Sequence, residues 1–384
     1  MIKILVLIDS STKFSRRFLY GLIKYSKENG PWVFYRLPSY YKTLYGETGI
    51  IKRIEEWGIN AVIAQWEYEE VDFLIKLDIP VFIQGYKEKK DNFSKISGNY
   101  TGAGEMAAKF FIKKRFKNFA FYGAKDLFWS SARAEGYRRE IEKHGGIFFY
   151  FESELLNGVE WSKGHVELND WLLSLPKPVA LFACDDVFAL QVSEICKLSN
   201  NSIPDELSLL GVDNDELICN LSYPAISSIV TDDENGGYNT GKMLNRIILN
   251  KKNVPFNIVI EPIRIELRRS TEKYNIMNDY ILNVVKYIED NYTSNISIEM
   301  LTKVVPLSRR TLEKRFKEEV GMSIYQFIIE KKVEQISNLL LTTEKSMFDI
   351  AMSAGYDDVR NVYRVFKQHT GITPTEFRKK FSRR

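Results

Sequence analysis

The sequence predicts a two-lobed α/β domain followed by an all-α domain with two helix-turn-helix units. Three observations support this fold class. Short apolar strands alternate with amphipathic helices up to about residue 265, only helical periodicity follows residue 278, and a fifty-residue repeat lies within that helical part. With 384 residues, 45% of them apolar, the chain is long and apolar enough for more than one hydrophobic core.

The α/β part is predicted from short apolar strands that are each followed by a helical stretch. This alternation is typical of a parallel sheet with helices on both faces. About six such strands precede residue 215 and two strand-like segments follow, which favours two lobes over a single sheet. The expected strands are 2–8, 61–64, 81–84, 118–122, 179–183, 207–212, 227–230 and 257–261.

The boundary between the two parts is marked by composition and charge. Residues 268–277 are polar and lack periodicity, so we interpret them as a linker between domains at 1–267 and 278–384. Residues 1–277 carry 36 basic and 36 acidic side chains, whereas residues 278–384 carry 18 and 14. The whole net charge of +4 therefore belongs to the helical domain.

The helical domain contains two copies of one motif. Phe316-Lys317, Gly321, Ser323 and Phe327 recur fifty residues later as Phe366-Lys367, Gly371, Thr373 and Phe377. Each copy predicts two helices joined by a turn, at about 297–319 and 346–369, with a connecting helix at 324–341. The predicted N-caps are Ser297, Ser308, Ser346 and Asp358, and the glycines at 321 and 371 end the second helices. The connecting helix is expected to hold the second helices of the two copies at a fixed separation, so that they can enter successive major grooves roughly 34 Å apart.

Basic and polar side chains gather on the second helix of each copy, which predicts contact with double-stranded DNA. Arginine forms paired hydrogen bonds with guanine, asparagine with adenine, and lysine attracts phosphate. The candidate DNA-binding residues are Ser308, Arg309, Arg310, Glu313, Lys314, Arg315, Arg360, Asn361 and Arg364. The alternative interpretation is that these are ordinary solvated helix faces.

A longer set of motifs in this domain includes Leu307-Ser308-Arg309-Arg310-Thr311-Leu312, Ile350-Ala351, Gly355-Tyr356 and Thr373-Pro374. Over about 100 residues the domain resembles the AraC family of bacterial regulators. That resemblance implies DNA binding through two helix-turn-helix units. Lys332 departs from the family, which usually has arginine at this place in the connecting helix.

Polar residues follow several strands of the α/β part, where ligands bind in open parallel sheets. Carboxylates and amides pair with adjacent hydroxyls and aromatic faces pack on C–H surfaces, so the set predicts a small polyhydroxylated ligand. The candidate ligand-binding residues are Arg16, Gln65, Trp66, Trp129, Arg133, Asp185, Asp213 and Asn214. We interpret Asp186 as a helix cap. Capping by Asp185 and Asp213, and a plain core role for the tryptophans, remain alternatives.

The motifs Asn99-Tyr100-x-Gly102-Ala103, Asp185-Asp186-x-x-Ala189-Leu190 and Leu209-Leu210-Gly211-Val212-Asp213-Asn214 make this part similar to LacI/GalR-type sugar-binding domains, which are periplasmic-binding-protein-like. The family's effector contacts fall on Arg133, Asp185 and Asp213, although asparagine is usual at the position of Asp185. A sugar domain that precedes the DNA-binding domain resembles regulators of xylose operons. This implies xylose or another aldose as the effector, with Arg16, Trp129, Arg133 and Asp213 as the best pocket candidates.

The main alternative is an enzyme, an NAD-type dehydrogenase or a sugar-modifying enzyme with a basic helical tail. Gly102-x-Gly104-x-x-Ala107 matches a dinucleotide fingerprint, but residues 95–100 make a poor strand before it and apolar residues 119–121 replace the required acid. Neither the three histidines nor the three cysteines have metal-ligand spacing, so no metal and no cofactor are expected.

The sequence thus predicts a sugar-responsive transcription regulator and not an enzyme. We expect the regulator to be an activator. The three cysteines lie inside apolar patterns and no apolar run approaches 18 residues, so we expect a cytoplasmic protein. The expected partners are an operator in double-stranded DNA, an aldose, a second copy in a homodimer and, for an activator, RNA polymerase.

Overall fold

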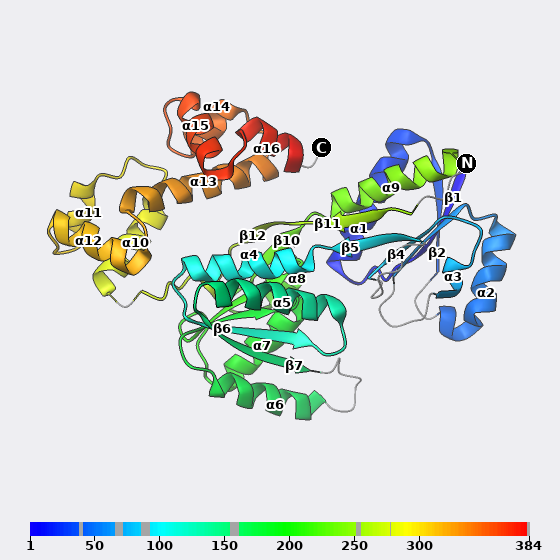
Figure 1. Ribbon diagram of the computed structural model, residues 1–384, viewed down its shortest axis with the longest axis horizontal. Helices are drawn as coiled ribbons and strands as arrows, with labels where there is room; N and C mark the ends of the chain where they lie inside the picture. Colours follow the sequence, from blue (N-terminus) through cyan, green and yellow to red (C-terminus); the bar gives the residue numbers. More distant parts are fainter. Residues whose placement is uncertain are drawn as a thin grey trace. The chain divides into compact units, whose positions relative to one another are not determined.

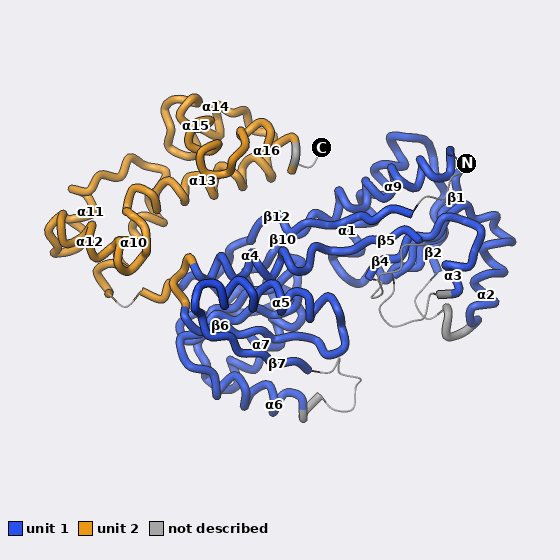
Figure 2. The backbone as a smooth tube through the Cα atoms, in the orientation of Figure 1, with its two compact units in different colours: residues 1–112, 117–273 blue, residues 113–116, 274–384 orange. Residues whose placement is uncertain are grey.

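The chain forms two compact units in the computed structural model, which describes residues 1–37, 41–65, 72–85, 93–153, 161–250, 255–276 and 278–381. Unit 1 comprises residues 1–112 and 117–273, and unit 2 comprises residues 113–116 and 274–384 (Figure 2). The predicted linker is therefore divided, because its residues up to Lys273 belong to unit 1 and those from Tyr274 belong to unit 2.

Unit 1 contains two six-stranded sheets, with helices between most of the successive strands (Figure 1). The strands are β1 (Ile2–Leu7), β2 (Trp32–Arg36), β3 (Ala61–Gln65), β4 (Val81–Gln84), β5 (Ser94–Gly98), β6 (Asn118–Ala124), β7 (Ile147–Ser153), β8 (Val179–Ala183), β9 (Leu207–Val212), β10 (Ser227–Thr231), β11 (Asn257–Ile260) and β12 (Pro262–Glu266). The helices are α1 (Lys13–Asn29), α2 (Tyr41–Trp57), α3 (Asp72–Ile75), α4 (Tyr100–Lys113), α5 (Phe128–Lys143), α6 (Trp161–Ser174), α7 (Asp186–Leu198), α8 (Glu216–Leu221) and α9 (Asp233–Asn250), with the 3-10 turn η1 (Arg269–Thr271).

The first sheet has the order β11-β5-β4-β3-β1-β2, and all its pairs are parallel. The second has the order β12-β10-β9-β8-β6-β7 and is parallel except where β10 meets β12. Because β11 returns to the first sheet and β12 to the second, the chain crosses between the sheets several times. Parallel strands place their carboxyl ends at one edge of each sheet, where polar side chains collect without interrupting the core.

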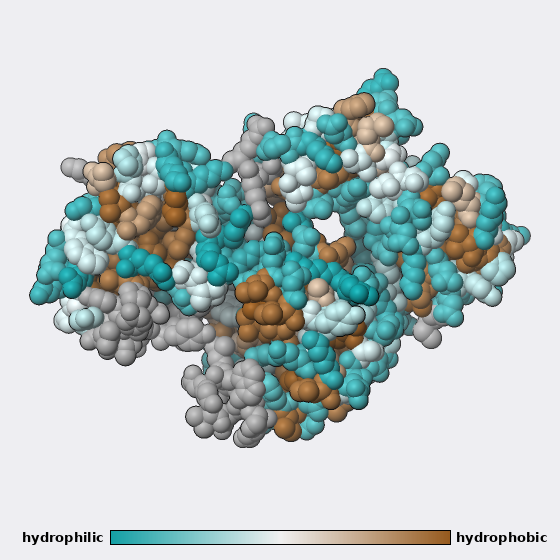
Figure 3. Space-filling view, turned by 180° about the vertical axis from the view of Figure 1, so that it is seen from behind, coloured by the Kyte–Doolittle hydropathy of each residue, from teal (hydrophilic) through white to brown (hydrophobic). Residues whose placement is uncertain are grey.

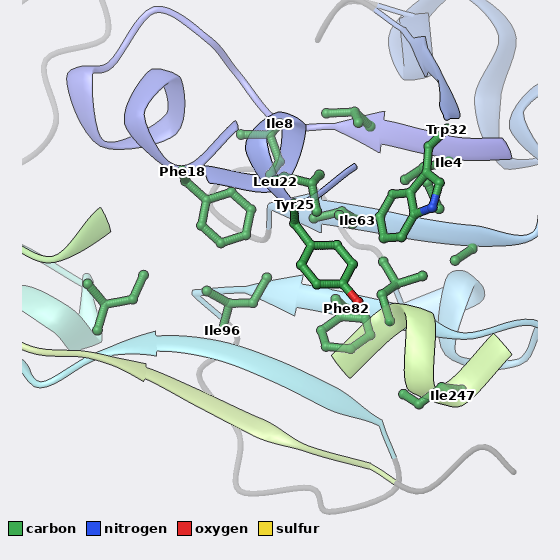
Figure 4. Packing of buried hydrophobic residues seen from close by; sticks show 14 residues of the cluster. Ile4, Ile8, Phe18, Leu22, Tyr25, Trp32, Ile63, Phe82, Ile96 and Ile247 are labelled. Carbon is green, nitrogen blue, oxygen red and sulfur yellow. The ribbon is translucent and has the colours of Figure 1, made fainter. Parts of the chain in front are cut away.

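Helices cover both faces of the first sheet, which explains why its central strands β1, β3 and β4 are almost continuously hydrophobic. On one face, α1 and α9 enclose a cluster in which Phe18, Leu22 and Tyr25 lie against the sheet (Figure 4). The Tyr25 and Trp32 rings lie 5.6 Å apart within this cluster. On the other face, Ile50 and Ile54 of α2 pack against a second cluster. This sheet therefore has a helical layer on each side.

The second sheet is covered in the same way. Tyr122 of β6 packs against Trp171 of α6 and Phe188 of α7, whereas Phe121 points to the opposite face and packs against Tyr137 of α5. The alternation of neighbouring residues between faces follows from the twofold side-chain period of a strand. All eight expected strands are present, within two residues of their predicted ends.

Four strands were not predicted from the sequence: β2, β5, β7 and β12. The prediction that the stretch before Tyr100 makes a poor strand is wrong, since Ser94–Gly98 forms β5 between β4 and β11. Its small and polar residues have low strand propensity, but two parallel neighbours satisfy its backbone. Tertiary pairing therefore overrides local preference at this strand.

Unit 2 is helical apart from its connections, which confirms the predicted all-α fold. Its helices are α10 (Asp279–Asn291), α11 (Ile298–Val304), α12 (Arg309–Val320), α13 (Ile324–Thr342), α14 (Met347–Ser353), α15 (Val359–Thr370) and α16 (Pro374–Phe381). One core cluster lies around α10, α11 and α12, and another around α13, α14 and α15. Each helix-turn-helix unit thus has its own core, and α13 contributes to both.

On the face shown in Figure 3, hydrophilic residues predominate and apolar residues form patches among them. None of the helices in the described part of the chain combines the length and apolar character needed to cross a bilayer. The three cysteines, Cys184, Cys196 and Cys219, are buried and unpaired.

Candidate functional site

A cavity of about 190 Å³ in unit 1 lies beyond the carboxyl ends of strands from both sheets. Gln65, Gln84 and Ile260 reach it from β3, β4 and β11 of the first sheet. Asp185 and Asp213 reach it from the turns after β8 and β9 of the second. The remaining lining residues are Thr12, Phe14, Gly98, Asn99, Tyr100, Ala103, Trp129, Arg133, Phe188 and Thr231.

The centre of the charged lining is Arg133 of α5, which is 6% exposed. Its guanidinium donates to the carbonyl oxygen of Cys184 and, at 3.3 Å, to Oδ1 of Asp213. The Trp129 and Tyr100 rings lie 5.2 Å and 5.5 Å from its central carbon, within the range of cation–π attraction. Arg133 is therefore fixed by an ion pair and two rings before any ligand binds.

Asp185 both lines this cavity and caps a helix. Its Oδ1 accepts a hydrogen bond of 2.8 Å from the backbone N–H of Phe188, which makes it the N-cap of α7. Burial raises the pKa of Asp185 to about 6, against a smaller lowering by that hydrogen bond. The prediction that Asp186 is the cap is wrong, because Asp186 instead accepts from Ser228 at 2.5 Å and from the backbone of Asp215 at 2.6 Å.

Several buried polar atoms of the lining have no hydrogen-bond partner within the described structure. They include Oε1 of Gln84, Nε1 of Trp129 and Nε of Arg133. Buried polar side-chain atoms normally have a partner, because an unsatisfied one loses its hydration without compensation. One acceptor and two donors on the lining of one cavity therefore fit a ligand that both donates and accepts hydrogen bonds.

The structure brings five of the eight predicted ligand-binding residues to this cavity: Gln65, Trp129, Arg133, Asp185 and Asp213. Two others lie beside it. Arg16 is half-exposed and donates to the backbone of Ser10 and to Asp215, and Asn214, the next residue after Asp213, is buried. The eighth, Trp66, lies outside the described residues.

Several lining residues were missed by sequence reasoning, notably Gln84, Asn99 and Tyr100. Gln84 is the last residue of β4 as Gln65 is the last residue of β3, so its position at the end of a strand was the signal. Asn99 and Tyr100 follow β5, which sequence reasoning did not recognise as a strand. Their side chains therefore could not be assigned to the edge of a sheet.

The glycines of the dinucleotide-like fingerprint have a packing explanation. Gly102 and Gly104 lie inside α4 rather than in the turn that such a fingerprint requires. A Cβ at Gly104 would come within 2.1 Å of the carbonyl oxygen of Arg133, so this glycine lets α4 and α5 approach closely. Among the described residues no group of histidine, cysteine, aspartate and glutamate is arranged to hold a metal.

The second candidate site is the surface of the two helix-turn-helix units. The four expected N-caps, Ser297, Ser308, Ser346 and Asp358, each accept a hydrogen bond from the first turn of the helix that they begin. Gly321, with a φ of 82°, ends α12. All nine predicted DNA-binding residues are exposed. The opposite faces of α12 and α15 bury Leu312, Phe316 and Val362, among others.

The exposed arginines differ in how they are held. Arg309 donates to Glu313 at 3.1 Å, and Arg360 pairs with Asp358 at 2.8 Å and lowers the pKa of that carboxyl. Within the described residues, neither Arg310 nor Arg315 forms an ion pair. Their guanidinium groups are therefore available for an anionic partner without first breaking an internal contact.

Lys332 shows how the turn of the second copy is stabilised. Its Nζ donates to the carbonyl oxygen of Gly355 at 3.0 Å and lies 4.7 Å from the centre of the Tyr356 ring. Gly355 has a φ of 70°, and a Cβ there would come within 1.7 Å of the carbonyl oxygen of Thr293. Both conformation and space therefore require glycine at this turn.

Comparison with known proteins places each unit in a known class. Residues 108–271 match the model of a periplasmic binding protein-like domain, and residues 301–380 match that of a helix-turn-helix domain. The xylose operon regulatory protein of Escherichia coli is 30% identical over 341 residues, which cover 85% of this chain and 86% of that protein. The protein of the same description from Haemophilus influenzae is 29% identical, with the same coverage.

Solved structures give the same result. The chain matches the structure of the xylose-binding transcription activator XylR with a TM-score of 0.62 and 25% identity, over 99% of this chain and 98% of the other. A periplasmic binding protein/LacI transcriptional regulator from Alkaliphilus metalliredigens, solved with D-xylulofuranose, matches with a TM-score of 0.58 and 20% identity over 70% of this chain and 98% of that one. The second likeness concerns the fold alone.

Proposed function

The chain belongs to the family of xylose operon regulatory proteins, and on that premise we propose that it activates sugar-utilisation genes in response to xylose or a closely related aldose. A periplasmic binding protein-like domain joined to a double helix-turn-helix domain makes it a sugar-responsive transcription regulator. The proposal concerns the identity of the sugar, the residues that bind it and the direction of the response.

The observation that carries the proposal is the polar character of the cavity lining. Asp185 and Asp213 supply carboxylate acceptors, Gln65 and Gln84 supply amides, and Arg133 supplies a fixed cation. Adjacent hydroxyls of a sugar ring donate to carboxylates and accept from a guanidinium at the same time. A volume of about 190 Å³ is small beside the roughly 300–1,000 Å³ typical of pockets for drug-sized ligands, which favours a monosaccharide.

Aromatic residues supply the apolar part of the proposed site. Trp129, Tyr100, Phe14 and Phe188 line the cavity together with the polar groups. Ring faces pack on the C–H surfaces of a sugar, and the unpartnered Nε1 of Trp129 adds one donor. Arg16, Trp66 and Asn214 stay part of the proposed site. In this proposal Arg16 and Asn214 hold the lining residues in place and do not themselves line the cavity.

The proposed DNA contacts follow from the exposed faces of α12 and α15. The amino-terminal turns of these helices carry Arg309, Arg310, Arg360 and Asn361, where side chains of a recognition helix meet base edges in the major groove. The 19 residues of α13 span about 28 Å at 1.5 Å per residue. A helix of that length is a suitable spacer for two recognition helices that enter successive major grooves about 34 Å apart.

We further propose that sugar binding changes the affinity for the operator, that the regulator acts as a homodimer, and that it contacts RNA polymerase when it activates. The support for coupling is the combination of a ligand cavity and DNA-binding helices in one chain. Thermodynamic linkage requires that a sugar which favours the DNA-binding state also binds more tightly in the presence of operator.

A thermal unfolding screen with monosaccharides tests the sugar part of the proposal. A ligand that binds only the folded state stabilises it, by about 2.7 kcal/mol at a concentration of 100 times Kd. We expect xylose to raise the unfolding temperature more than arabinose, ribose, glucose or galactose at equal concentration. If no pentose or hexose raises it at millimolar concentration, the proposed effector class is wrong.

A further inference from the structure

The loop that carries Asp213 has an unusual backbone. Asp213 and Asn214 have φ values of 91° and 50°, both in the left-handed region although neither residue is glycine. Such conformations persist only where the surrounding structure determines them strongly, and they concentrate at binding and switch sites. The loop that presents a pocket carboxylate is therefore held in place by its neighbours.

Hydrogen bonds from three directions hold this loop. The backbone N–H of Asn214 donates to Oγ of Ser228 at 2.9 Å, and that hydroxyl donates to Oδ1 of Asp186 at 2.5 Å. Oδ2 of Asp186 accepts from the backbone N–H of Asp215 at 2.6 Å. Lys13 donates to the carbonyl oxygen of Asn214 from the side of α1. Both the backbone N–H and the carbonyl oxygen of Asn214 are thus hydrogen-bonded.

The side chain of Asn214 has a separate partner, Arg268. The guanidinium of Arg268 donates to Oδ1 of Asn214 at 2.7 Å and to the carbonyl oxygen of Ile226 at 2.9 Å. This planar group therefore joins the loop after β9 to the segment before β10. Arg268 lies in unit 1, six residues before Tyr274, where the chain enters unit 2.

The residues after Arg268 are attached to the same two strands. Ser270 donates to the carbonyl oxygen of Leu209 in β9 at 2.6 Å and accepts from the backbone N–H of Ser227 in β10 at 2.8 Å. The hydroxyls of Ser227 and Thr271 lie 2.7 Å apart. The start of the connection to unit 2 is therefore bonded to the strands whose ends form one wall of the cavity.

We propose that Arg268 is a positioning residue that links the pocket carboxylate Asp213 to the connection between the two units. The proposal rests on the sugar site described above. A sugar that bonds to Asp213 shifts or tightens the strained loop, the shift changes the bond between Asn214 and Arg268, and Arg268 carries it into residues 269–273. The coupling element is thus a single side-chain bond between a pocket loop and the covalent connection to the DNA-binding unit.

A double-mutant cycle tests this proposal in the full-length protein. The variants are Arg268→Met, which removes the donors and keeps an apolar stem, Asn214→Gly, which keeps the left-handed backbone and removes the acceptor, and their combination. The matched control is Arg269→Met, because the neighbouring Arg269 is exposed and, among the described residues, forms only a long ion pair of 3.9 Å with Glu272. Xylose affinity is measured by calorimetry, and operator affinity by fluorescence anisotropy with and without xylose.

We expect each single variant to weaken xylose binding by about fivefold or more and to reduce the effect of xylose on operator affinity, as removal of one coupling interaction does. The combined variant should bind xylose no more weakly than the single variant with the lower xylose affinity, because both changes break the same bond. The control should match wild type in both measurements. If the variants lower the unfolding temperature but change neither xylose affinity nor the effect of xylose on operator affinity, Arg268 has a structural role only and the proposal is wrong.

The two hypotheses fail differently in this experiment. The proposal for Arg268 is wrong if the single variants keep the wild-type xylose affinity and the wild-type response of operator binding. It is also wrong if the effects of the two substitutions simply add in the combined variant. If wild type itself binds no sugar, the proposed function is wrong and this inference fails with it. Should Arg268→Met not fold, Asn214→Gly alone decides, since its backbone conformation suits glycine.

Discussion

Replacing Arg133 with methionine is the sharpest perturbation of the proposed sugar site. The side chain is 7% exposed, and its Nε has no hydrogen-bond partner within the described structure. Methionine keeps an unbranched apolar chain but removes the charge and every donor. If Nε donates to a sugar hydroxyl, the loss of one charge-assisted hydrogen bond costs about 1.5–3 kcal/mol, which weakens binding about 10- to 150-fold.

The same substitution also affects stability, and the two effects can be separated. Asp213 loses its ion pair and the carbonyl oxygen of Cys184 loses a donor. An unsatisfied buried polar group costs about 1–3 kcal/mol, so the free energy of unfolding should fall by that order. Titration calorimetry with xylose must therefore be done well below the unfolding temperature of the variant, with circular dichroism to verify the fold.

Arg138→Met is the matched control on the same helix. Arg138 is half-exposed and pairs with Glu135 at 2.7 Å, and an exposed pair of this kind contributes little to stability. The control should bind xylose as wild type does. If Arg133→Met is folded and binds xylose within threefold of wild type, a difference of about 0.7 kcal/mol, Arg133 does not bind the sugar.

Three further predictions concern pH, DNA and the helical turn. Because burial raises the pKa of Asp185 to about 6, xylose affinity measured by calorimetry should fall as the pH drops from 7.5 to 5 and the acceptor carboxylate takes up a proton. Asp185→Asn should flatten that profile, and an unchanged slope would exclude Asp185 as the titrating contact. Arg310→Ala should weaken specific operator binding by about 1–3 kcal/mol in anisotropy titrations, whereas Lys286→Ala on α10 should not; equal effects would place the base contacts elsewhere. Gly355→Ala should lower the free energy of unfolding by at least about 2 kcal/mol in denaturant titrations, since it combines a positive φ with a clash against Thr293, and a neutral result would show that the turn can rearrange.

The sign of the stability change at Asp185 follows from the same pKa. The folded-state value of about 6 lies above the unfolded value of about 3.9, so the folded state holds the proton more tightly. This group therefore contributes stability at low pH that is lost as the pH rises from about 4 to 6. Asp185→Asn should make the free energy of unfolding less dependent on pH within that window.

The helical domain could be predicted from the sequence almost to the residue because its determinants are local. Ser297 and Ser308 cap helices, and Gly321 ends one, through interactions within a few residues of each position. Periodic apolar residues such as Leu312 and Phe316 then fix which face is buried. A repeat doubles each of these local signals, which is why both helix-turn-helix units were found.

The α/β part was less predictable because its determinants are distant in sequence. β5 gains its partners from β4 and β11, and β11 lies about 160 residues further along the chain. Propensity alone does not report such pairing. Asn99 and Tyr100 were missed for the same reason, whereas Asp185 and Asp213 follow strongly apolar strands and were recognised.

The roles of individual polar residues depended on geometry that spacing does not encode. Asp185 and Asp186 are adjacent in sequence, and either could have capped α7. The structure gives the cap to Asp185 and directs Asp186 to Ser228, 42 residues away. Likewise Arg268, within a segment that the sequence presents as a linker, is bonded to a pocket loop by a contact across 54 residues.

The proposed coupling between sugar binding and DNA binding in one chain is tested by the operator affinity of the full-length protein with and without xylose. The DNA is an operator selected by the protein itself from a random-sequence library, and affinity is measured by fluorescence anisotropy at fixed salt. We expect saturating xylose to change the operator Kd by at least about fivefold, the lower end of typical allosteric coupling. An identical Kd with no sugar, with xylose and with each of the other aldoses would contradict it.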